Sequence, residues 1–335
     1  MMLVDLLACA HSLVHPGKGI LAADESTTTA DKRLEQFGIK SSVEMRRKER
    51  DLFLATPDIE KYLSGVILYQ ETLTQKSKSG KYFPKLLWEK GIVPGIKVDE
   101  GTEPMADNPD ELITNGLIGL EDRVAKYHKE SHTGFAKWRA VIRIDGDRLP
   151  TAQALVENAK RLATYAKCVQ ETGMVPVVEP EVLLEGKHSR ARARAVIETT
   201  MKAVIAALED QSLDMSGVVV KTAMALSGNK SGRKDTPEEV AEDTVTALVN
   251  SIPKGLAGVV FLSGGQTPDQ ATENLRAIAH YAAKAGAPWP MTFSYARALQ
   301  EEALEVWRGK EENVDAARDI YMSRLEKVFN AARGA

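Results

Sequence analysis

The feature that most constrains the fold is a short apolar segment that recurs eight times, with a stretch of helical character between one and the next. The segments cover residues 19–24, 65–70, 93–98, 138–144, 175–179, 217–222, 258–263 and 291–295. Short apolar runs of this kind are typical of strands buried on both faces of a parallel sheet. Eightfold alternation of strand and helix predicts an α/β fold, a single (β/α)8 TIM barrel spanning residues 1–335. A doubly wound sheet is the alternative.

Helix start signals support the alternation. Thr236 and Thr267 each precede a proline and stand three residues before Glu or Gln, which predicts capping boxes. The segment Asn108-Pro109-Asp110-Glu111 repeats the device with asparagine. A first amphipathic helix is predicted from helical spacing at Leu3, Leu6, Leu7, Ala10 and Val14.

Composition excludes several classes of protein. The net charge of −3 over 335 residues gives no broad basic surface, so no nucleic-acid partner is expected. Cys9 and Cys168 are too few for a disulfide framework and fit a reducing compartment. No apolar run approaches the roughly 20 residues of a membrane span, so no membrane partner is expected. The predicted location is cytoplasmic.

Lys221 ends the apolar run Val218-Val219-Val220. A lysine at the end of a buried strand is desolvated, which favours the neutral amine over the ammonium ion. A neutral amine is the nucleophile that Schiff-base chemistry on a carbonyl requires. The alternative is a lysine whose side chain extends past the strand end into solvent.

Other strand ends add polar groups at what is expected to be the same mouth of the barrel. Ser263-Gly264-Gly265 and Arg297 suit a phosphate, although a turn that needs only the flexibility of glycine is the alternative. Glu179 and Glu181 are two residues apart on a strand, so their side chains point the same way. One could act as the acid/base while the other holds a lysine in place; the alternative is a pair of structural ion pairs. Asp24 is either a base or a helix cap.

No metal site and no cofactor is predicted. Gly17-Lys18-Gly19-Ile20-Leu21-Ala22 formally fits a dinucleotide fingerprint, but it precedes a strand instead of following one. The pairs His11/His15 and His128/His132 have helical spacing but no third ligand, so they are expected at the surface or in packing.

Together these motifs resemble class I fructose-1,6-bisphosphate aldolase, the Schiff-base type. The likeness covers nearly the full chain, and the motifs stand in the family's order. They are Gly17-Lys18-Gly19-Ile20-Leu21-Ala22-Ala23-Asp24-Glu25-Ser26, Phe135-Ala136-Lys137-Trp138-Arg139, Val178-Glu179-Pro180-Glu181, Phe261-Leu262-Ser263-Gly264-Gly265-Gln266 and Thr292-Phe293-Ser294-Tyr295-Ala296-Arg297.

The resemblance implies a role for each matched residue. Lys221 corresponds to the Schiff-base lysine, Glu179 to the acid/base of its formation, and Lys137 to a lysine assisting the proton transfers. Asp24 corresponds to the carboxylate that accepts the C4 hydroxyl proton, and Glu181 to a supporting carboxylate. The strand-end rule alone selects Asp145 instead of Lys137. The implied substrate-binding residues are Ser263, Gly264, Gly265, Ser294, Ala296 and Arg297 around the C1 phosphate, and Ser26, Thr29, Lys32, Arg33, Lys97 and Arg139 around the C6 phosphate.

The implied activity is reversible, metal-free cleavage of fructose 1,6-bisphosphate to dihydroxyacetone phosphate and glyceraldehyde 3-phosphate, in glycolysis and gluconeogenesis. The implied partners are sugar phosphates and further copies of the chain, by resemblance in a tetramer. The alternatives are a sugar-phosphate-binding scaffold without turnover and a Schiff-base aldolase for another sugar phosphate. The sequence ends at Ala335 without the family's tyrosine-bearing tail, so the group that protonates the enamine stays open.

Overall fold

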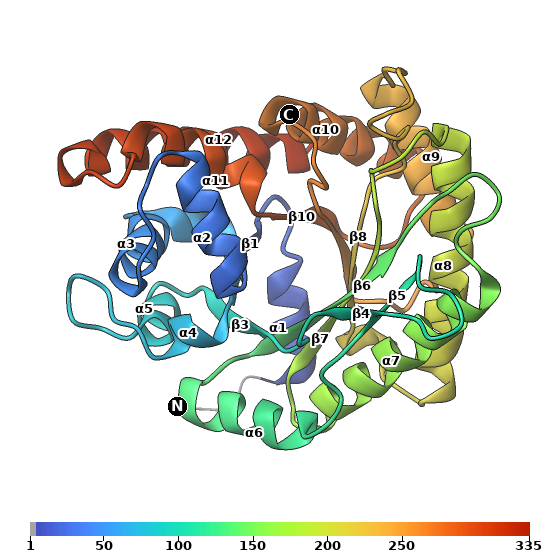
Figure 1. The fold of residues 1–335 in the computed structure, drawn as a ribbon, viewed down its shortest axis with the longest axis horizontal. Helices are drawn as coiled ribbons and strands as arrows, with labels where there is room; N and C mark the ends of the chain where they lie inside the picture. Colours follow the sequence, from blue (N-terminus) through green and yellow to red (C-terminus); the bar gives the residue numbers. More distant parts are fainter. Residues whose placement is uncertain (1–4) are drawn as a thin grey trace.

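The computed structural model describes residues 5–335, and within them eight parallel strands close a barrel in the order β1-β10-β9-β8-β7-β6-β3-β2 (Figure 1). The strands are β1 (Gly19–Ala23), β2 (Leu63–Leu68), β3 (Val93–Lys97), β6 (Phe135–Ile142), β7 (Val175–Val182), β8 (Val219–Thr222), β9 (Gly258–Phe261) and β10 (Met291–Tyr295). Strand β1 pairs with both β2 and β10, so the sheet has no edge. The predicted (β/α)8 barrel is confirmed, and the doubly wound alternative is excluded.

Helices surround the barrel. The principal ones are α1 (Leu6–Leu13), α2 (Thr27–Gln36), α3 (Val43–Leu54), α4 (Gln70–Leu73), α5 (Phe83–Glu89), α6 (Leu120–Ser131), α7 (Ala152–Glu171), α8 (Arg190–Asp210), α9 (Pro237–Val249), α10 (Pro268–Ala285), α11 (Arg297–Trp307) and α12 (Val314–Ala332). Figure 1 shows α2 to α5 on one side of the barrel and α7 to α9 on the opposite side. None of the helices within residues 5–335 has both the length and the apolar character needed to cross a bilayer.

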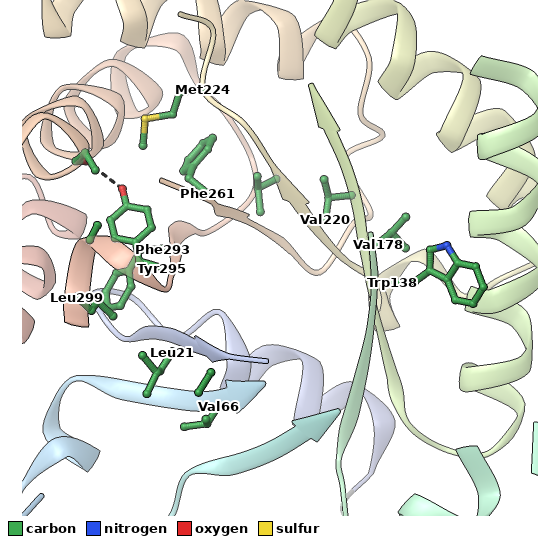
Figure 2. Close-up of a cluster of buried hydrophobic side chains, with 14 of the residues drawn as sticks. Leu21, Val66, Trp138, Val178, Val220, Met224, Phe261, Phe293, Tyr295 and Leu299 are labelled. Carbon is green, nitrogen blue, oxygen red and sulfur yellow. Dashed lines mark hydrogen bonds between the residues drawn. The ribbon is translucent and has the colours of Figure 1, made fainter. Parts of the chain in front are cut away.

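Strand alternation divides the apolar side chains into two cores. Val219 belongs to the cluster inside the barrel, whereas Val220 belongs to the larger cluster between the barrel and its helices. Figure 2 shows Val220 beside Trp138 and Val178 in this outer cluster. Because side chains alternate along a strand, the residue after Val220 faces inward again. That residue is Lys221, so its direction is fixed by its position on β8.

Helix α1 closes the amino-terminal end of the barrel. A Cβ atom added to Gly65 on β2 would lie 2.7 Å from Leu13, and one added to Gly258 on β9 would lie 2.8 Å from Val14. Both glycines are needed because the helix packs directly on the strand backbone. The amphipathic first helix is confirmed from Leu6 onward; the predicted contribution of Leu3 lies outside the described residues. The opposite, carboxyl end is left open.

The predicted helix at Asn108 is wrong. The segment forms a turn between two short strands, β4 (Thr102–Pro104) and β5 (Leu112–Thr114). The Glu111 carboxylate, expected to bond back to the Asn108 backbone, accepts hydrogen bonds from the Asn108 side-chain Nδ2 (2.8 Å) and from Thr151 N (2.8 Å) and Oγ1. The asparagine and a distant partner on the chain therefore share the carboxylate, and no helix begins at Asn108. The helix starts at Thr236 and Thr267 are confirmed, with a complete capping box at Thr236.

Candidate active site

A cavity of about 1020 Å³ opens at the carboxyl ends of the strands. Every residue that the family resemblance assigns to the site lines it except Gly265. Gly265 lies just behind the wall, where an added Cβ would be 3.9 Å from the Arg297 guanidinium. Gly264 and Gly265 have φ angles of +54° and +89°, a backbone conformation that glycine adopts at little cost.

Lys221 and Glu179 form a buried pair inside this cavity. Lys221 Nζ lies 2.9 Å from Glu179 Oε1, and the two side chains are only 5% and 4% exposed. Their strands β7 and β8 are neighbours, and both residues occupy inward positions. The alternative in which Lys221 extends into solvent is therefore excluded.

Lys137 joins the carboxylates of the site. Its Nζ lies 2.7 Å from Asp24 Oδ2, 3.2 Å from Glu179 Oε2 and 3.9 Å from Asp99 Oδ2. Burial disfavours the charged amine, but the Asp24 and Glu179 carboxylates outweigh it and raise the pKa of Lys137. Lys137 therefore stays an ammonium ion at neutral pH and holds the Asp24 and Glu179 carboxylates near each other.

The carboxylates respond to the same charges. Burial alone favours the neutral acid, but Lys137 and Lys221 outweigh it and lower the pKa values of Asp24 and Glu179. Both groups are therefore ionised and available as proton acceptors at neutral pH. Glu179 is placed to exchange protons with Lys221, and Asp24 is held on the far side of Lys137.

Further ion pairs frame this centre. Lys97 Nζ lies 2.6 Å from Asp99 Oδ1, and Arg139 bonds to Glu181. Asp99 also accepts a hydrogen bond from the Arg139 backbone N–H at 3.3 Å. The sequence analysis gave Asp99 no role, and its position two residues after Lys97, just past the end of β3, was the signal available.

Strand β6 extends past the end of its neighbour β3, and this explains why the last residues of β6 do not mark the mouth of the barrel. Lys137 pairs in register with Lys97, the last residue of β3, so it lies at the mouth although it is the third residue of its own strand. The remaining residues of β6 extend beyond the mouth beside β7. Asp145 comes after this overhang, is exposed, and pairs with Arg148 at 2.5 Å.

Several donors in the cavity wall have no partner among residues 5–335. Ser294 Oγ and Arg33 Nη2 are buried without a hydrogen bond. The Gly264 and Gly265 N–H groups donate no backbone hydrogen bond within the same residues. Because buried unpaired donors are costly, this arrangement suits an oxyanion ligand.

The sequence analysis assigned no role to a second group of lining residues, which come from helices and loops. They are Glu25, Gln36, Tyr69, Gln70, Glu100, Arg123 and Tyr127. Arg123 and Tyr127 stand four apart on α6 and therefore share one face of that helix. That spacing alone does not indicate which way the face points, so only the packed structure identifies them.

Comparisons with known proteins agree with this geometry. Residues 5–335 match the family model described as fructose-bisphosphate aldolase class-I. The chain is 45% identical over 330 residues to the cytosolic fructose-bisphosphate aldolase 4 of Arabidopsis thaliana, covering 98% of this chain and 83% of that protein. It is 42% identical to a probable fructose-bisphosphate aldolase class 1 of Xanthomonas campestris, covering 100% and 99%.

A solved structure is similar throughout. The fructose-bisphosphate aldolase of Plasmodium falciparum, crystallised with TRAP and a small-molecule inhibitor, superposes with a TM-score of 0.95. The two sequences are 41% identical, and the match covers 98% of this chain and 94% of the other. The chain therefore belongs to the class-I fructose-bisphosphate aldolase family and is an enzyme of the lyase class.

Proposed function

We propose that this enzyme cleaves fructose 1,6-bisphosphate reversibly to dihydroxyacetone phosphate and glyceraldehyde 3-phosphate through a Schiff base on Lys221. The observation that carries the proposal is the buried chain of contacts from Lys221 through Glu179 and Lys137 to Asp24, with steps of 2.9, 3.2 and 2.7 Å. It supports the proposal because the groups to which we assign the roles of nucleophile, acid/base and second base are in contact along one wall.

The first stage forms the iminium ion. Lys221 gives a proton to Glu179, and its free amine attacks the C2 carbonyl of the substrate. Glu179 then returns a proton to the hydroxyl group of the carbinolamine, which leaves as water. The positive charge of Lys137 keeps Glu179 ionised before the first transfer, so that it can accept the proton of Lys221.

The second stage breaks the C3–C4 bond. Asp24 takes the proton of the C4 hydroxyl, the C4–O bond becomes a carbonyl, and the C3–C4 electron pair moves into the iminium to give an enamine. Glyceraldehyde 3-phosphate leaves as the aldehyde. Asp24 suits this role because Lys137 holds it as a carboxylate at 2.7 Å.

The phosphate groups anchor the two ends of the substrate. Ser263, Gly264, Ser294 and Arg297 supply hydroxyl, N–H and guanidinium donors at the ends of β9 and β10. Ala296, which also lines the cavity, and Gly265, beside the Arg297 guanidinium, are assigned to the same phosphate through their backbones. The other phosphate is assigned to a group across the cavity, Ser26, Thr29, Lys32, Arg33, Lys97 and Arg139. Binding both ends holds the reacting bond in place.

We infer a wider role in which residues 1–335 act as one domain and the enzyme is cytosolic like its Arabidopsis relative. By the resemblance of its motifs to the family, we also propose that it assembles as a homotetramer and serves glycolysis and gluconeogenesis. No metal is assigned to the reaction, because each carboxylate of the site is paired with Lys or Arg.

The test is reduction with borohydride in the presence of dihydroxyacetone phosphate and EDTA, followed by peptide mass mapping. We expect a stable adduct on Lys221 and none on the equally buried Lys137. Lys221→Met should abolish the adduct and lower kcat by at least about 10³-fold, since covalent catalysis is lost. An unlabelled Lys221 in an active enzyme, or activity that requires a divalent metal, would contradict the proposal.

A further inference from the structure

The loop that carries Ser263 and Gly264 is held by two buried amide side chains outside the cavity's catalytic wall. Gln266 is 6% exposed and Asn274, on α10, is 2% exposed. Asn274 Nδ2 donates to Gln266 Oε1 at 2.7 Å, and Gln266 Nε2 donates to the Ser263 carbonyl at 2.9 Å. The Gln266 backbone N–H reaches the same carbonyl at 3.0 Å.

These bonds fix the orientation of one peptide plane. The Ser263 C=O and the Gly264 N–H belong to the same trans peptide unit, in which the two groups point in opposite directions. Holding the carbonyl toward Gln266 therefore directs the Gly264 N–H the other way. Ser263 and Gly264 line the cavity, and the Gly264 N–H makes no backbone hydrogen bond within residues 5–335.

The loop needs such a restraint. Gly264 and Gly265 both have positive φ, and consecutive glycines leave a backbone with many accessible conformations. Asn274 holds Gln266 from the long helix α10, and Gln266 in turn holds the Ser263 carbonyl, so the loop is ordered before a ligand arrives. Donors that are already oriented bind an oxyanion without a further ordering cost.

The Gln266 side-chain amide also contacts the segment that follows β8, the strand that carries Lys221. Gln266 Nε2 lies 3.6 Å from Met224 Sδ, and Met224 follows Lys221 by three residues. Figure 2 shows Met224 near Phe261 and Tyr295 in the outer cluster, where apolar packing holds it. The Ser263 loop and the segment after β8 are thereby linked through one side chain.

We propose that Gln266, supported by Asn274, is a positioning residue for phosphate recognition: it aims the Gly264 N–H at the phosphate next to the reacting carbonyl. This rests on the proposed function, because it assigns a cause to phosphate binding in that site. Neither residue lies in the chain of contacts from Lys221 to Asp24.

The test compares two probes that differ only in the phosphate, dihydroxyacetone phosphate and dihydroxyacetone, trapped on Lys221 with borohydride. Gln266→Met keeps the side chain's length and removes its hydrogen bonds. The double variant Gln266→Met/Asn274→Leu also removes the partner that would be left unpaired, which protects folding. Asn158→Leu on α7 is the matched control, a buried asparagine donating to the Leu112 and Ala154 carbonyls at 2.9 and 3.1 Å.

We expect both Gln266 variants to raise the half-saturating concentration of dihydroxyacetone phosphate about tenfold, the usual effect of one hydrogen bond to a charged group. Trapping of dihydroxyacetone should stay within about twofold of wild type, and Asn158→Leu should not separate the two probes. Unchanged trapping of the phosphate ester, or parallel loss with both probes, would overturn the inference. Wild-type enzyme that traps neither probe would instead overturn the proposed function.

Discussion

At the scale of single residues, buried charge decides the chemistry. Lys137, Asp24 and Glu179 would each favour the neutral form if buried alone, but together they remain ionised. The pairing also explains why the cavity can hold carboxylates without losing their function as bases.

Glu49 shows the opposite balance. It lies on α3, is 8% exposed, and lines a small internal cavity with Glu25 and Gln300 behind the Arg33 side of the site. Burial raises its pKa from 4.5 to about 7, because the nearby Arg33 only partly offsets the loss of solvation. Glu25 adds to this rise by repulsion.

Glu49→Gln should therefore stabilise the protein in a pH-dependent way. The folded state keeps a proton on Glu49 between pH 4.5 and 7 that the unfolded state releases, so wild-type stability falls as pH rises through this window. Glutamine removes that dependence. We expect no difference below pH 4.5 and a gain of about 3 kcal/mol in the free energy of unfolding at pH 8.

Urea unfolding at pH 4.5 and pH 8 measures this difference. Glu44→Gln on the same helix is the control, since Glu44 is 61% exposed and its pairing with Arg47 contributes little. A gain that is equal at both pH values would show that the effect is packing and not titration.

At the scale of elements, α9 depends on its first turn. Thr236 Oγ1 accepts from Glu239 N at 3.3 Å, and Glu239 Oε2 accepts from Thr236 N at 2.9 Å. The bond from the Thr236 N–H is the main cause of a lowered Glu239 pKa. The first four N–H groups of a helix have no hydrogen-bond partner within the helix. The capping box provides partners for two backbone N–H groups at the start of α9.

Thr236→Ala should cost about 1 kcal/mol of unfolding free energy, because the cap is lost while the surface packing is unchanged. Thr199→Ala provides the matched control, since Thr199 is an exposed residue in the interior of α8 whose hydroxyl bonds to the Ala195 carbonyl. It should be neutral or slightly stabilising. Equal destabilisation by both changes, measured by urea unfolding, would refute a capping role.

At the scale of the whole molecule, the barrel is closed at one end and open at the other. Phe135 fills the interior near the closed end, directly against the backbone of Gly95 on the neighbouring strand. A Cβ added to Gly95 would lie 2.3 Å from the Phe135 ring. Glycine at this position lets the barrel close around an aromatic side chain.

Gly95→Ala should destabilise the enzyme by about 3 kcal/mol, because the ring has no free space into which to move. Gly255→Ala is the control: an added Cβ there meets nothing within 4 Å, and the residue is not at positive φ. We expect a neutral or slightly stabilising effect at Gly255. Thermal unfolding of the two variants checks this, and similar melting temperatures would contradict the packing argument.

The barrel and most of the residues that line the cavity could be predicted from the amino-acid sequence. Apolar strands with polar ends identify the mouth of a parallel barrel, and strand alternation places Glu179 and Glu181 on one face. These are local rules, so they can be read from residues a few positions apart.

The remaining features of the site depend on contacts between distant parts of the chain. The register of β6 against β3 brings Lys137 to the mouth of the barrel and leaves Asp145 outside. The Glu111 carboxylate binds Thr151, 40 residues along the chain, and does not cap a helix at Asn108. Arg123 enters the cavity because of how α6 packs. Each outcome depends on partners distant along the chain, and the offsets and packing angles that bring them together are properties of the closed barrel as a whole.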